Sequence, residues 1–577
     1  MTRIFAEPGS FVDDALAGLV LAHADELQRV DGGVIRRAPL AEGRVAVVVG
    51  GGSGHYPAFA GYVGPGIAAG AVCGNIFSSP SAAQAFRVAS AVHAGGGVLF
   101  SYGNYAGDVI HFGKAEQLLR AEGIDTRTVL VTDDIASAPA EEAARRRGIA
   151  GDLCVFRIAG AAAERGDTLD EVERLAVAAN ERTRTIGVAF AGCTLPGADR
   201  PLFTVPEGMM SIGLGIHGEP GIRDVPLQRA DELAHTLVGL LLDDRPDTRA
   251  TRVAVVVNGL GTVKYEELFV LFRFVAAELD AAGLQMVAPL CGELVTSLDM
   301  AGASVTLLWL DDELEPLWLA PVQSPALRRG APAQLSDVPV RGAESAPLVA
   351  PSGDPPRNRE ASAQSHQAAA VVVRLLTVAR EAVDANVESL GALDSVAGDG
   401  DHGVGMARGL GAALRAARAD VEGGGGVGSA LESAGAAWSD EAGGTSGALW
   451  GAALESMGGV LETSSALDAT AIADAVSAAR ASIERLGKAT LGDKTMLDAI
   501  IPFEQALRGQ ISAGADLGAS VSAAAAAATE AAAATARLRP RLGRARPLAE
   551  KSVGHPDPGA TSFALIVSTI GEEQSWA

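Results

Sequence analysis

A histidine flanked by glycines is the first feature of this chain that could do chemistry. His217 lies in SIGLGIHGEPG (211–221), where small neighbours leave the imidazole open to a ligand. A second histidine, His55, follows the run GGGSG (50–54), and Asp108 ends the stretch NYAGD (104–108). An aspartate and a histidine held together can take a proton from a hydroxyl group, whereas Asp108 alone would equally suit a helix N-cap. The hypothesis is therefore that Asp108 and His55 form a general base toward a hydroxyl group, while His217 by itself could also be an ordinary residue of a glycine-rich loop.

The glycine-rich loops do not fit the common loop motifs. A P-loop needs Gly-Lys-Ser/Thr, but Lys114 and Lys488, which follow glycines, each precede alanine. The nucleophile elbow Gly-x-Ser-x-Gly would need glycine where His55 stands. GLGIHG (213–218) matches Gly-x-Gly-x-x-Gly but has no clear strand before it, so we interpret this match as chance.

A second group of chemical residues lies in the C-terminal half of the chain. LDSVAGDGDHGVGM (393–406) carries Asp394, Asp399 and Asp401 within eight residues. Clustered carboxylates repel one another unless a cation lies between them, and oxygen ligands with open positions suit Mg²⁺. An EF-hand is disfavoured because no glutamate stands at the twelfth loop position. The alternative is a solvated acidic turn between two helices.

Three further loops in this half have residues suited to phosphate. GGTSG (443–447) offers backbone N–H groups and hydroxyls at the start of a predicted helix. LGDKTM (491–496) carries a lysine and a threonine, and HPDPGA (555–560) predicts a rigid turn that opens the last helix. These loops favour a nucleotide site.

Two kinds of secondary structure must position these residues. Short Val/Leu-rich runs that end in glycine loops predict strands buried in an α/β sheet at 44–51, 96–102, 128–134 and 252–259, with a helix at 168–185. In the C-terminal half, apolar residues recur three, four or seven apart. Helices are predicted there at 366–390, 403–420, 446–461, 468–486, 494–509 and 515–537.

A segment rich in Pro, Ala, Ser and Gly separates these halves. It spans 329–365 and predicts a linker. We therefore expect an α/β domain at 1–328 and an all-helical domain at 366–577.

Composition restricts the partners and the compartment. The 46 basic and 70 acidic side chains give a net charge of −24, which disfavours nucleic acid and anionic membranes. The four cysteines lie far apart without a Cys-x-x-Cys pair, as in a reducing compartment. No strongly apolar stretch of about 18 residues is present, and the N-terminal residues lack a signal-peptide pattern. We expect a cytoplasmic protein that contacts neither nucleic acid nor membrane.

Six ordered motifs resemble those of the dihydroxyacetone kinase family, in its single-chain, ATP-dependent form. They are GGGSGH (50–55), NYAGD (104–108), GLGIHGEPG (213–221), LDSVAGDGDHG (393–403), GGTSG (443–447) and HPDPGA (555–560). The resemblance covers nearly the whole chain apart from the linker. It implies an α/β domain that binds a short ketose and a barrel of antiparallel helices that binds ATP.

The resemblance also implies a role for each site residue. His217 would attack the ketose carbonyl to form a covalent hemiaminal, while His55 and Asp108 would orient the terminal hydroxyl and take its proton. The substrate would further contact Gly52, Ser53, Gly54 and Gly103. Asp394, Asp399 and Asp401 would bind Mg²⁺. The nucleotide site would be lined by His402, Thr445, Ser446, Thr495, Met496, Asp557, Pro558 and Gly559. The family resemblance implies a homodimer.

The chain departs from the family pattern beside the substrate. Gly103 stands where relatives that act on dihydroxyacetone commonly have lysine, and Tyr56 where an acidic residue is usual. Loss of the long cation would enlarge the pocket, so a four-carbon ketose such as D- or L-erythrulose is a candidate substrate beside dihydroxyacetone. Two alternatives remain: a ketose-binding regulatory protein without catalysis, and a cyclising lyase activity on FAD.

Overall fold

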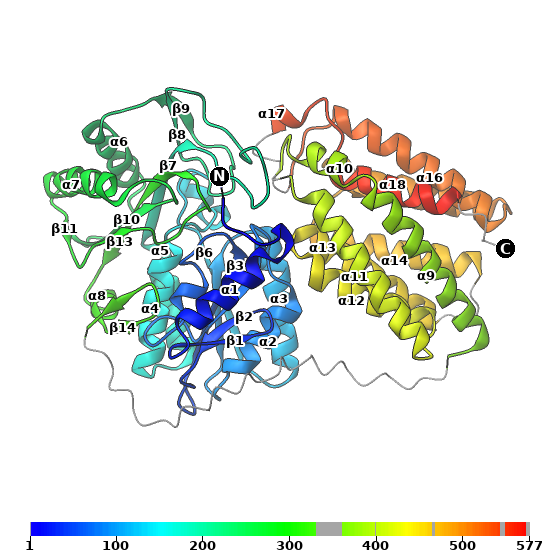
Figure 1. Ribbon diagram of the computed structural model, residues 1–577, viewed down its shortest axis with the longest axis horizontal. Coiled ribbons are helices and arrows are strands. Elements are labelled where there is room, and N and C mark those ends of the chain that lie inside the picture. The colour runs from blue at the N-terminus through cyan, green and yellow to red at the C-terminus, as the bar shows by residue number, and fades with distance from the viewer. Residues whose placement is uncertain (1, 331–360, 399, 464–467, 543–548, 573–577) are drawn as a thin grey trace. The chain divides into compact units, whose positions relative to one another are not determined.

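The chain forms two compact units, residues 1–349 and 350–577, which are coloured blue to green and lime to red in Figure 1. The structure is a computed structural model that describes residues 2–330, 361–398, 400–463, 468–542 and 549–572. Most of the predicted linker at 329–365 lies outside these residues, so its extent stays a prediction. At its end the structure differs slightly: helix α9 begins at Ala363, because Ser362 Oγ accepts the N–H of Ser365 at 3.1 Å and caps the helix there.

The first unit contains a six-stranded sheet of order β1-β2-β4-β3-β5-β6. Its strands are β1 (Leu27–Val30), β2 (Gly33–Arg36), β3 (Ala46–Ser53), β4 (Gly70–Ile76), β5 (Val98–Gly103) and β6 (Thr126–Val131). Strands β4, β3, β5 and β6 are mutually parallel, whereas β1 and β2 pair antiparallel at one edge. The predicted strands at 44–51, 96–102 and 128–134 are therefore confirmed as β3, β5 and β6.

Helices cover both faces of this sheet, which is why its parallel strands read as continuous apolar runs. The helices are α1 (Phe11–Ala22), α2 (Ala82–Val92), α3 (Ala106–Ala121), α4 (Asp152–Arg165) and α5 (Leu169–Glu181), with short 3₁₀ turns η1 (Pro8–Ser10), η2 (Ala60–Tyr62) and η3 (Ala140–Arg145). Apolar residues of α2 and α3 form one core with the sheet, and those of α1, α4 and α5 form another on the opposite face.

A second, mostly antiparallel sheet completes this unit, in the order β11-β10-β13-β7-β8-β9 with β12 beside β10. Its elements are β7 (Thr183–Ala191), β8 (Met209–Ile212), β9 (Arg223–Pro226), α6 (Ala230–Asp243), β10 (Arg252–Gly259), α7 (Tyr265–Ala281), β11 (Gln285–Met286), β12 (Leu290–Gly292), β13 (Ala301–Leu310), α8 (Leu314–Leu319), β14 (Val322–Gln323) and β15 (Arg328–Arg329). Helices α6 and α7 pack on one face, and the other face joins the core beneath α4. The helix predicted at 168–185 is too long: β7 starts at Thr183, where β-branched residues favour a strand.

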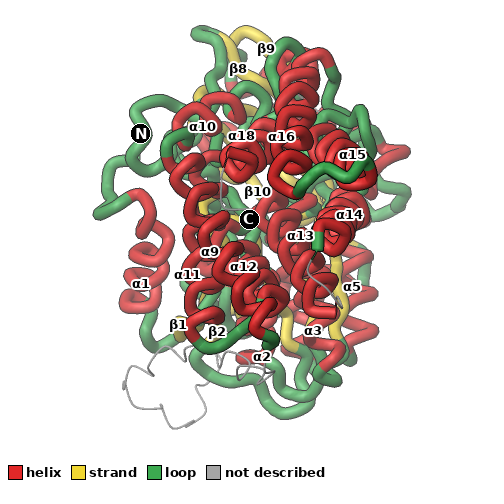
Figure 2. Tube along the Cα trace, turned by 90° about the vertical axis from the view of Figure 1, so that its right-hand side faces the viewer, coloured by secondary structure: helices red, strands yellow, loops and turns green. Residues whose placement is uncertain are grey.

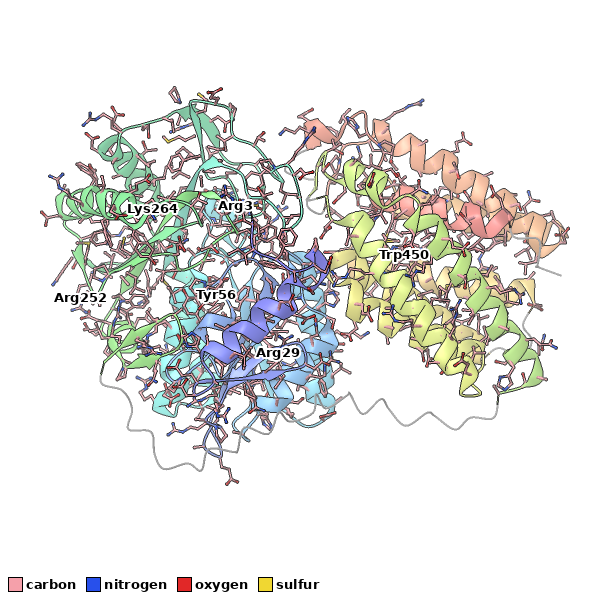
Figure 3. The ribbon with its side chains drawn as sticks, in the orientation of Figure 1. Arg3, Arg29, Tyr56, Arg252, Lys264 and Trp450 are labelled. Atoms are coloured by element: carbon pink, nitrogen blue, oxygen red, sulfur yellow. The ribbon has the colours of Figure 1, made fainter. Side chains whose placement is uncertain are left out.

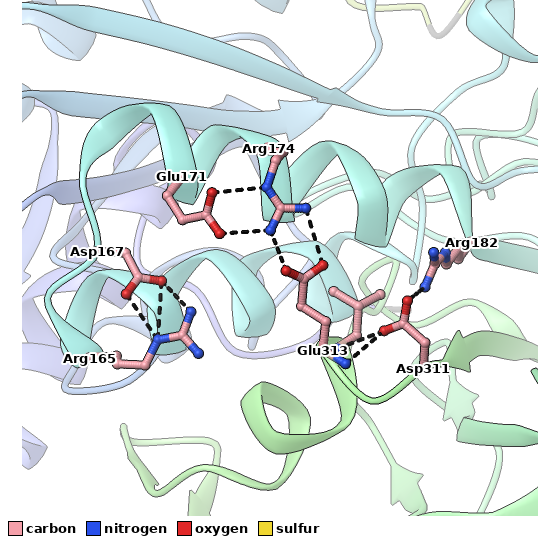
Figure 4. Close-up of polar contacts among 8 residues, drawn as sticks. Arg165, Asp167, Glu171, Arg174, Arg182, Asp311 and Glu313 are labelled. Carbon is pink, nitrogen blue, oxygen red and sulfur yellow. Dashed lines mark hydrogen bonds and ion pairs between the residues drawn. The ribbon is translucent and has the colours of Figure 1, made fainter.

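Arginine pairs join the helices of the first sheet to the last long strand of the second. Arg174 in α5 donates from Nε to Glu171 at 2.9 Å and from Nη1 to Glu313 at 3.1 Å (Figure 4). Arg182, just after α5, pairs with Asp311, which follows β13. These contacts help to fix the relative positions of the two sheets.

The second unit is helical throughout its described residues. Its helices are α9 (Ala363–Asp384), α10 (Val387–Asp394), α11 (His402–Glu422), α12 (Val427–Ala442), α13 (Gly444–Thr463), α14 (Ala469–Gly487), α15 (Leu497–Ser512), α16 (Leu517–Ala534), η4 (Thr535–Arg537), α17 (Ala549–Ser552) and α18 (Pro558–Glu572). Helices α9, α11 and α12 lie side by side in Figures 1 and 2, and α16 packs on α15 and α18. The α/β-plus-all-α fold class predicted from the sequence is confirmed.

One helical stretch, Leu517–Arg537, is long and apolar enough by length and composition to cross a membrane. In the structure one face of this helix, which includes Val521, Ala524 and Ala528, is buried in the bundle, while residues such as Ala519 and Ala526 are exposed. The core helix of a globular bundle has the same two properties.

Candidate active site

Three adjacent parallel strands end beside one another at the predicted substrate site. β4 ends just before Phe77, β3 ends at Ser53 and β5 ends at Gly103, and β3 pairs with both neighbours. Ligands of α/β sheets bind at this carboxyl edge of the strands. His217 reaches the same place from the second sheet, on the loop between β8 and β9.

The two predicted histidines meet in this site. His55 Nε2 lies 3.0 Å from His217 Nε2, and the ring centroids are 4.9 Å apart. Phe77 stacks on His55 at 5.0 Å and meets His217 edge-on at 5.1 Å, while Tyr105 meets His217 edge-on at 5.1 Å. The aromatic rings hold both imidazoles in fixed planes.

Acceptor oxygens determine which ring nitrogens carry protons. His55 Nδ1 faces the Thr296 carbonyl oxygen at 2.7 Å, and His217 Nδ1 faces Glu219 Oε1 at 3.1 Å. A carbonyl or carboxylate oxygen only accepts, so each Nδ1 donates its proton. This leaves a lone pair on His217 Nε2, the atom suited to attack a carbonyl.

A buried ionic network stands behind His217. Arg147 lies 3.5 Å from Glu219 Oε1 and 2.9 Å from Asp134 Oδ2. Burial alone would raise the pKa of the Glu219 carboxyl, but Arg147 and His217 outweigh burial and hold that pKa well below its usual range. Glu219 is therefore an anion that fixes the tautomer of His217.

We expect the substitution Glu219→Gln to lower kcat/KM for the ketose by about 10²-fold, because a misoriented imidazole attacks poorly. The KM for ATP should stay unchanged. The matched control is Glu278→Gln, which removes the charge from a surface glutamate bonded to His235 at 3.0 Å and should leave the kinetics unchanged. Steady-state kinetics of both variants check this; parent-like kcat/KM in Glu219→Gln would contradict the orienting role.

A segment after β12 joins the two histidine loops. The N–H of Thr296 donates to the His55 carbonyl at 3.2 Å, and Ser297 Oγ donates to the carbonyl of Ile216. Asn258 in β10 supports this segment, since its side-chain oxygen accepts from the N–H of Val295 at 2.9 Å. The second sheet thereby sets the separation of His55 and His217.

Asp108 lies in the first turn of α3, directly after β5, and is 7% exposed. Its negative charge helps to raise the pKa of Asp152, whose main cause is burial, so the two carboxyls are close. The alternative position of Asp108 as a helix N-cap is wrong, because Tyr105 is the N-cap of α3. Asp108 lies in the first turn as a buried carboxyl at the edge of the site.

At the predicted substrate-contacting glycines, neighbouring groups leave no room for a side chain. A β-carbon on Gly52 would lie 2.7 Å from the Ser78 nitrogen, and one on Gly54 would lie 2.8 Å from the Phe77 ring. Ser53 Oγ donates to the Gly74 carbonyl at 2.7 Å, which fixes this hydroxyl between the strands.

The two positions that depart from the family pattern lie at the rim of this site. At Gly103 a β-carbon would lie 3.1 Å from both the Gly148 oxygen and Tyr105 Cε2. The space expected from the missing lysine is thus partly filled by neighbouring chain. Tyr56, labelled in Figure 3, is 48% exposed, and its carbonyl accepts from Thr296 Oγ1 at 2.9 Å.

In the helical unit, the acidic loop meets the last helix. Asp394 ends α10, and its Oδ2 accepts the Gly400 N–H at 2.9 Å; Asp401 precedes α11. Asp399 lies outside the described residues. His402 Nε2 contacts Ser562 Oγ in α18 at 2.9 Å, and burial lowers the pKa of His402 against the opposing effect of Asp394 and Asp401.

The turn at the start of α18 also meets the loop before α15. A β-carbon on Gly559, which follows Pro558, would lie 3.3 Å from Met496 Cβ. The Asp557 carboxyl accepts the Ala560 N–H at 2.8 Å and caps α18. Burial, and then the charges of Asp498 and Asp394, raise the pKa of Asp557 to about 7 although Lys494 opposes them. Three of the predicted loops therefore converge on α18.

The remaining residues predicted to bind the nucleotide lie at the starts of α13 and α15. Thr445 and Ser446 are exposed in the first turn of α13, where helix N–H groups lack intrahelical acceptors. Thr495 precedes α15, and its N–H donates to Asp498 Oδ2 at 2.8 Å.

The chemistry of the donors around the acidic loop fits Mg²⁺. Asp394 and Asp401 supply carboxylate oxygens, the ligands that Mg²⁺ prefers. The effect of Asp394 on the pKa of Asp557 shows that negative charge accumulates where a divalent cation would relieve it. Among the described residues, from which Asp399 is missing, no group of three metal-ligating side chains is assembled.

Comparisons with known proteins match both units. The Dak1 domain family matches residues 17–326, and the DAK2 domain family matches 396–572. The chain belongs to the dihydroxyacetone kinase family. The predicted membership and the predicted activity, an ATP-dependent kinase of a short-chain ketose, are confirmed.

Relatives in this family match over the full length. The chain is 52% identical over 574 residues to an L-erythrulose kinase of Pectobacterium atrosepticum, covering 99% of this chain and 96% of that protein. It is 52% identical over 573 residues to a D-erythrulose kinase of Mycolicibacterium smegmatis, covering 99% and 98%. The crystal structure of the dihydroxyacetone kinase from C. freundii in complex with AMP-PNP and Mg²⁺ matches 99% of both chains at 28% identity and a TM-score of 0.53.

Several residues that contact the two site histidines or their partners were not predicted from the motifs. Glu219 was inside the quoted motif, two residues after His217, and an acid so close to an exposed histidine was a usable signal. Tyr105 was equally inside NYAGD. Arg147 and Thr296 had no local signal, because their roles depend on contacts far along the chain.

Proposed function

We propose that this chain phosphorylates erythrulose with ATP. The main support is the 52% identity, over 99% of the chain, to kinases named for L-erythrulose and for D-erythrulose. Gly103 supports the proposal, since a lysine is absent beside a pocket that must admit one more carbon. In the candidate ketose site, His217 provides a nucleophile for the carbonyl group of the substrate.

The proposed capture step uses both histidines. His217 Nε2 attacks the C2 carbonyl carbon, the C=O π bond breaks, and the electron pair moves to oxygen. Because both Nδ1 atoms donate, the 3.0 Å contact between the Nε2 atoms needs a shared proton, which His55 holds. That proton passes to the new alkoxide, and the resulting hemiaminal carries one positive charge on the alkylated His217 ring, which the Glu219 carboxylate at 3.1 Å balances. Glycerol, which has no carbonyl, is excluded.

The proposed transfer step uses Asp108. The terminal hydroxyl of the captured ketose attacks the γ-phosphorus of ATP while the Asp108 carboxylate takes its proton, and ADP leaves. Asp394, Asp399 and Asp401 would hold Mg²⁺, which supplies charge neutralisation on the phosphates. Thr445 and Ser446 offer N–H groups and hydroxyls to phosphate oxygens from the first turn of α13.

Steady-state kinetics with dihydroxyacetone, D-erythrulose and L-erythrulose test the substrate. We expect kcat/KM for one erythrulose enantiomer to exceed that for dihydroxyacetone. A clear preference for dihydroxyacetone would overturn the erythrulose assignment and leave the ketose kinase activity standing.

The proposal extends to the cellular form of the protein. We propose a cytoplasmic homodimer that needs neither membrane nor nucleic acid, and the four reduced cysteines support a reducing compartment. Light scattering of the full chain measures the molar mass; the mass of a single chain would overturn the dimer.

A further inference from the structure

A buried carboxyl without a role in the steps above lies next to the substrate site. Asp152 begins α4 and is 3% exposed. Its Oδ1 atom is buried and makes no hydrogen bond within the described part of the chain. A buried polar atom left unpaired costs free energy, so such an atom requires an explanation.

Asp152 does not serve as a helix cap. The first N–H groups of α4 already have acceptors: those of Leu153 and Cys154 donate to the carbonyls of Ala150 and Gly151 at 3.3 and 2.9 Å. The neighbouring Asp133 is the structural carboxyl here, since its two oxygens accept the N–H groups of Ile149 and Gly151 at 2.9 and 2.7 Å. The Asp152 carboxyl is left for another partner.

The surroundings of Asp152 lead to the ketose site. A β-carbon on Gly148 would lie 2.9 Å from Asp152 Oδ1 and 2.4 Å from the Cα of Gly103. A β-carbon on Gly103 would in turn lie 3.1 Å from Tyr105 Cε2, and the Tyr105 ring meets His217 at 5.1 Å. Asp152, Gly148, Gly103, Tyr105 and His217 are thus successive neighbours.

The chemistry of Asp152 suits a hydroxyl group. Burial, and then the charges of Asp133 and Asp108, raise the pKa of the Asp152 carboxyl well above its usual range. A neutral carboxylic acid can both donate and accept, as a hydroxyl group can. The groups between this carboxyl and the ketose site are the side-chain-free backbones of Gly148 and Gly103, which pack against each other.

We propose that Asp152 is a specificity-determining residue. Its carboxyl binds a hydroxyl group at the non-reacting end of a four-carbon ketose, which the additional carbon places within reach. With the carbonyl captured on His217 and the reacting hydroxyl at Asp108, the remaining end of the ketose extends along Gly103 to Asp152. Dihydroxyacetone is one carbon shorter and does not reach this carboxyl. This inference rests on the proposed erythrulose kinase activity.

The test compares two ketoses in the full-length chain. We expect Asp152→Ala to lower kcat/KM for erythrulose by about 10–100-fold, mainly through KM, and that for dihydroxyacetone by less than about threefold, because only one ketose loses a hydrogen bond. Asp152→Asn keeps an acceptor and a donor and should restore most of the erythrulose activity. Asp133→Asn is the matched structural control and should lower both activities in parallel.

The outcomes distinguish a specificity role of Asp152 from a structural one. A parallel loss on both ketoses in Asp152→Ala, as in the Asp133 control, would mean a structural role and would overturn the inference, as would unchanged kinetics on both. If the parent chain does not phosphorylate either erythrulose enantiomer, the proposed substrate itself fails, and this is read from the parent before any variant.

Discussion

Substitution of Asp108 by asparagine is expected to lower kcat by about 10²–10⁴-fold, because the ketose hydroxyl loses its proton acceptor. The side chain is 7% exposed, so bulk water does not readily replace it as a base. The ketose should still be captured, since His217 and His55 are unchanged. Steady-state kinetics should therefore show a lowered kcat with little change in either KM.

The competing explanation for Asp108 is that it only stabilises the start of α3. Asp170 is a matched control, because it also lies in the first turn of a helix, α5, and its side chain is 84% exposed. Asp170→Asn should affect only the melting temperature. If Asp108→Asn also changed stability and left kcat at the parent value, the proton-acceptor role would be wrong.

Local sequence patterns predicted the parts of the site that depend on local structure. The strand ends at Ser53 and Gly103 follow from apolar runs that stop at glycines, and the start of α18 follows from a proline and a helix cap. The resemblance to the dihydroxyacetone kinase family supplied the predicted roles of His217, His55 and Asp108, since composition alone would leave His217 as an ordinary loop residue.

The unpredicted parts depend on long-range packing. Arg147 pairs with Asp134 and Glu219, and the carbonyl oxygen of Thr296 accepts a hydrogen bond from His55 Nδ1, 241 positions away in the chain. Pairing of β7 with β13 likewise depends on register, which a short run such as TRTIG does not reveal. The missing side chain at Gly103 leaves less extra space than expected, because the backbone of Gly148 lies against this position.

The substitution His217→Ala should abolish covalent capture of the ketose. With a ketose labelled with ¹³C at C2, the parent should convert the carbonyl signal to that of a tetrahedral carbon, and native mass spectrometry should show one adduct per site. Neither should occur in the variant, because Glu219 and Arg147 then support no nucleophile. We expect kcat/KM for the ketose to fall by about 10²-fold or more, as orientation is lost.

Two comparisons make this result specific to His217. His235→Ala removes another histidine that is bonded to a glutamate, with a side chain 78% exposed, and should retain both the adduct and the activity. Asp108→Asn should keep the tetrahedral carbon signal while losing turnover, which would show that different residues perform capture and phosphoryl transfer. A His217→Ala variant that kept the parent kcat/KM would overturn the covalent role. A variant that lost both the adduct and the preference for ketose over glycerol would establish that the enzyme recognises the carbonyl by forming a covalent bond with it.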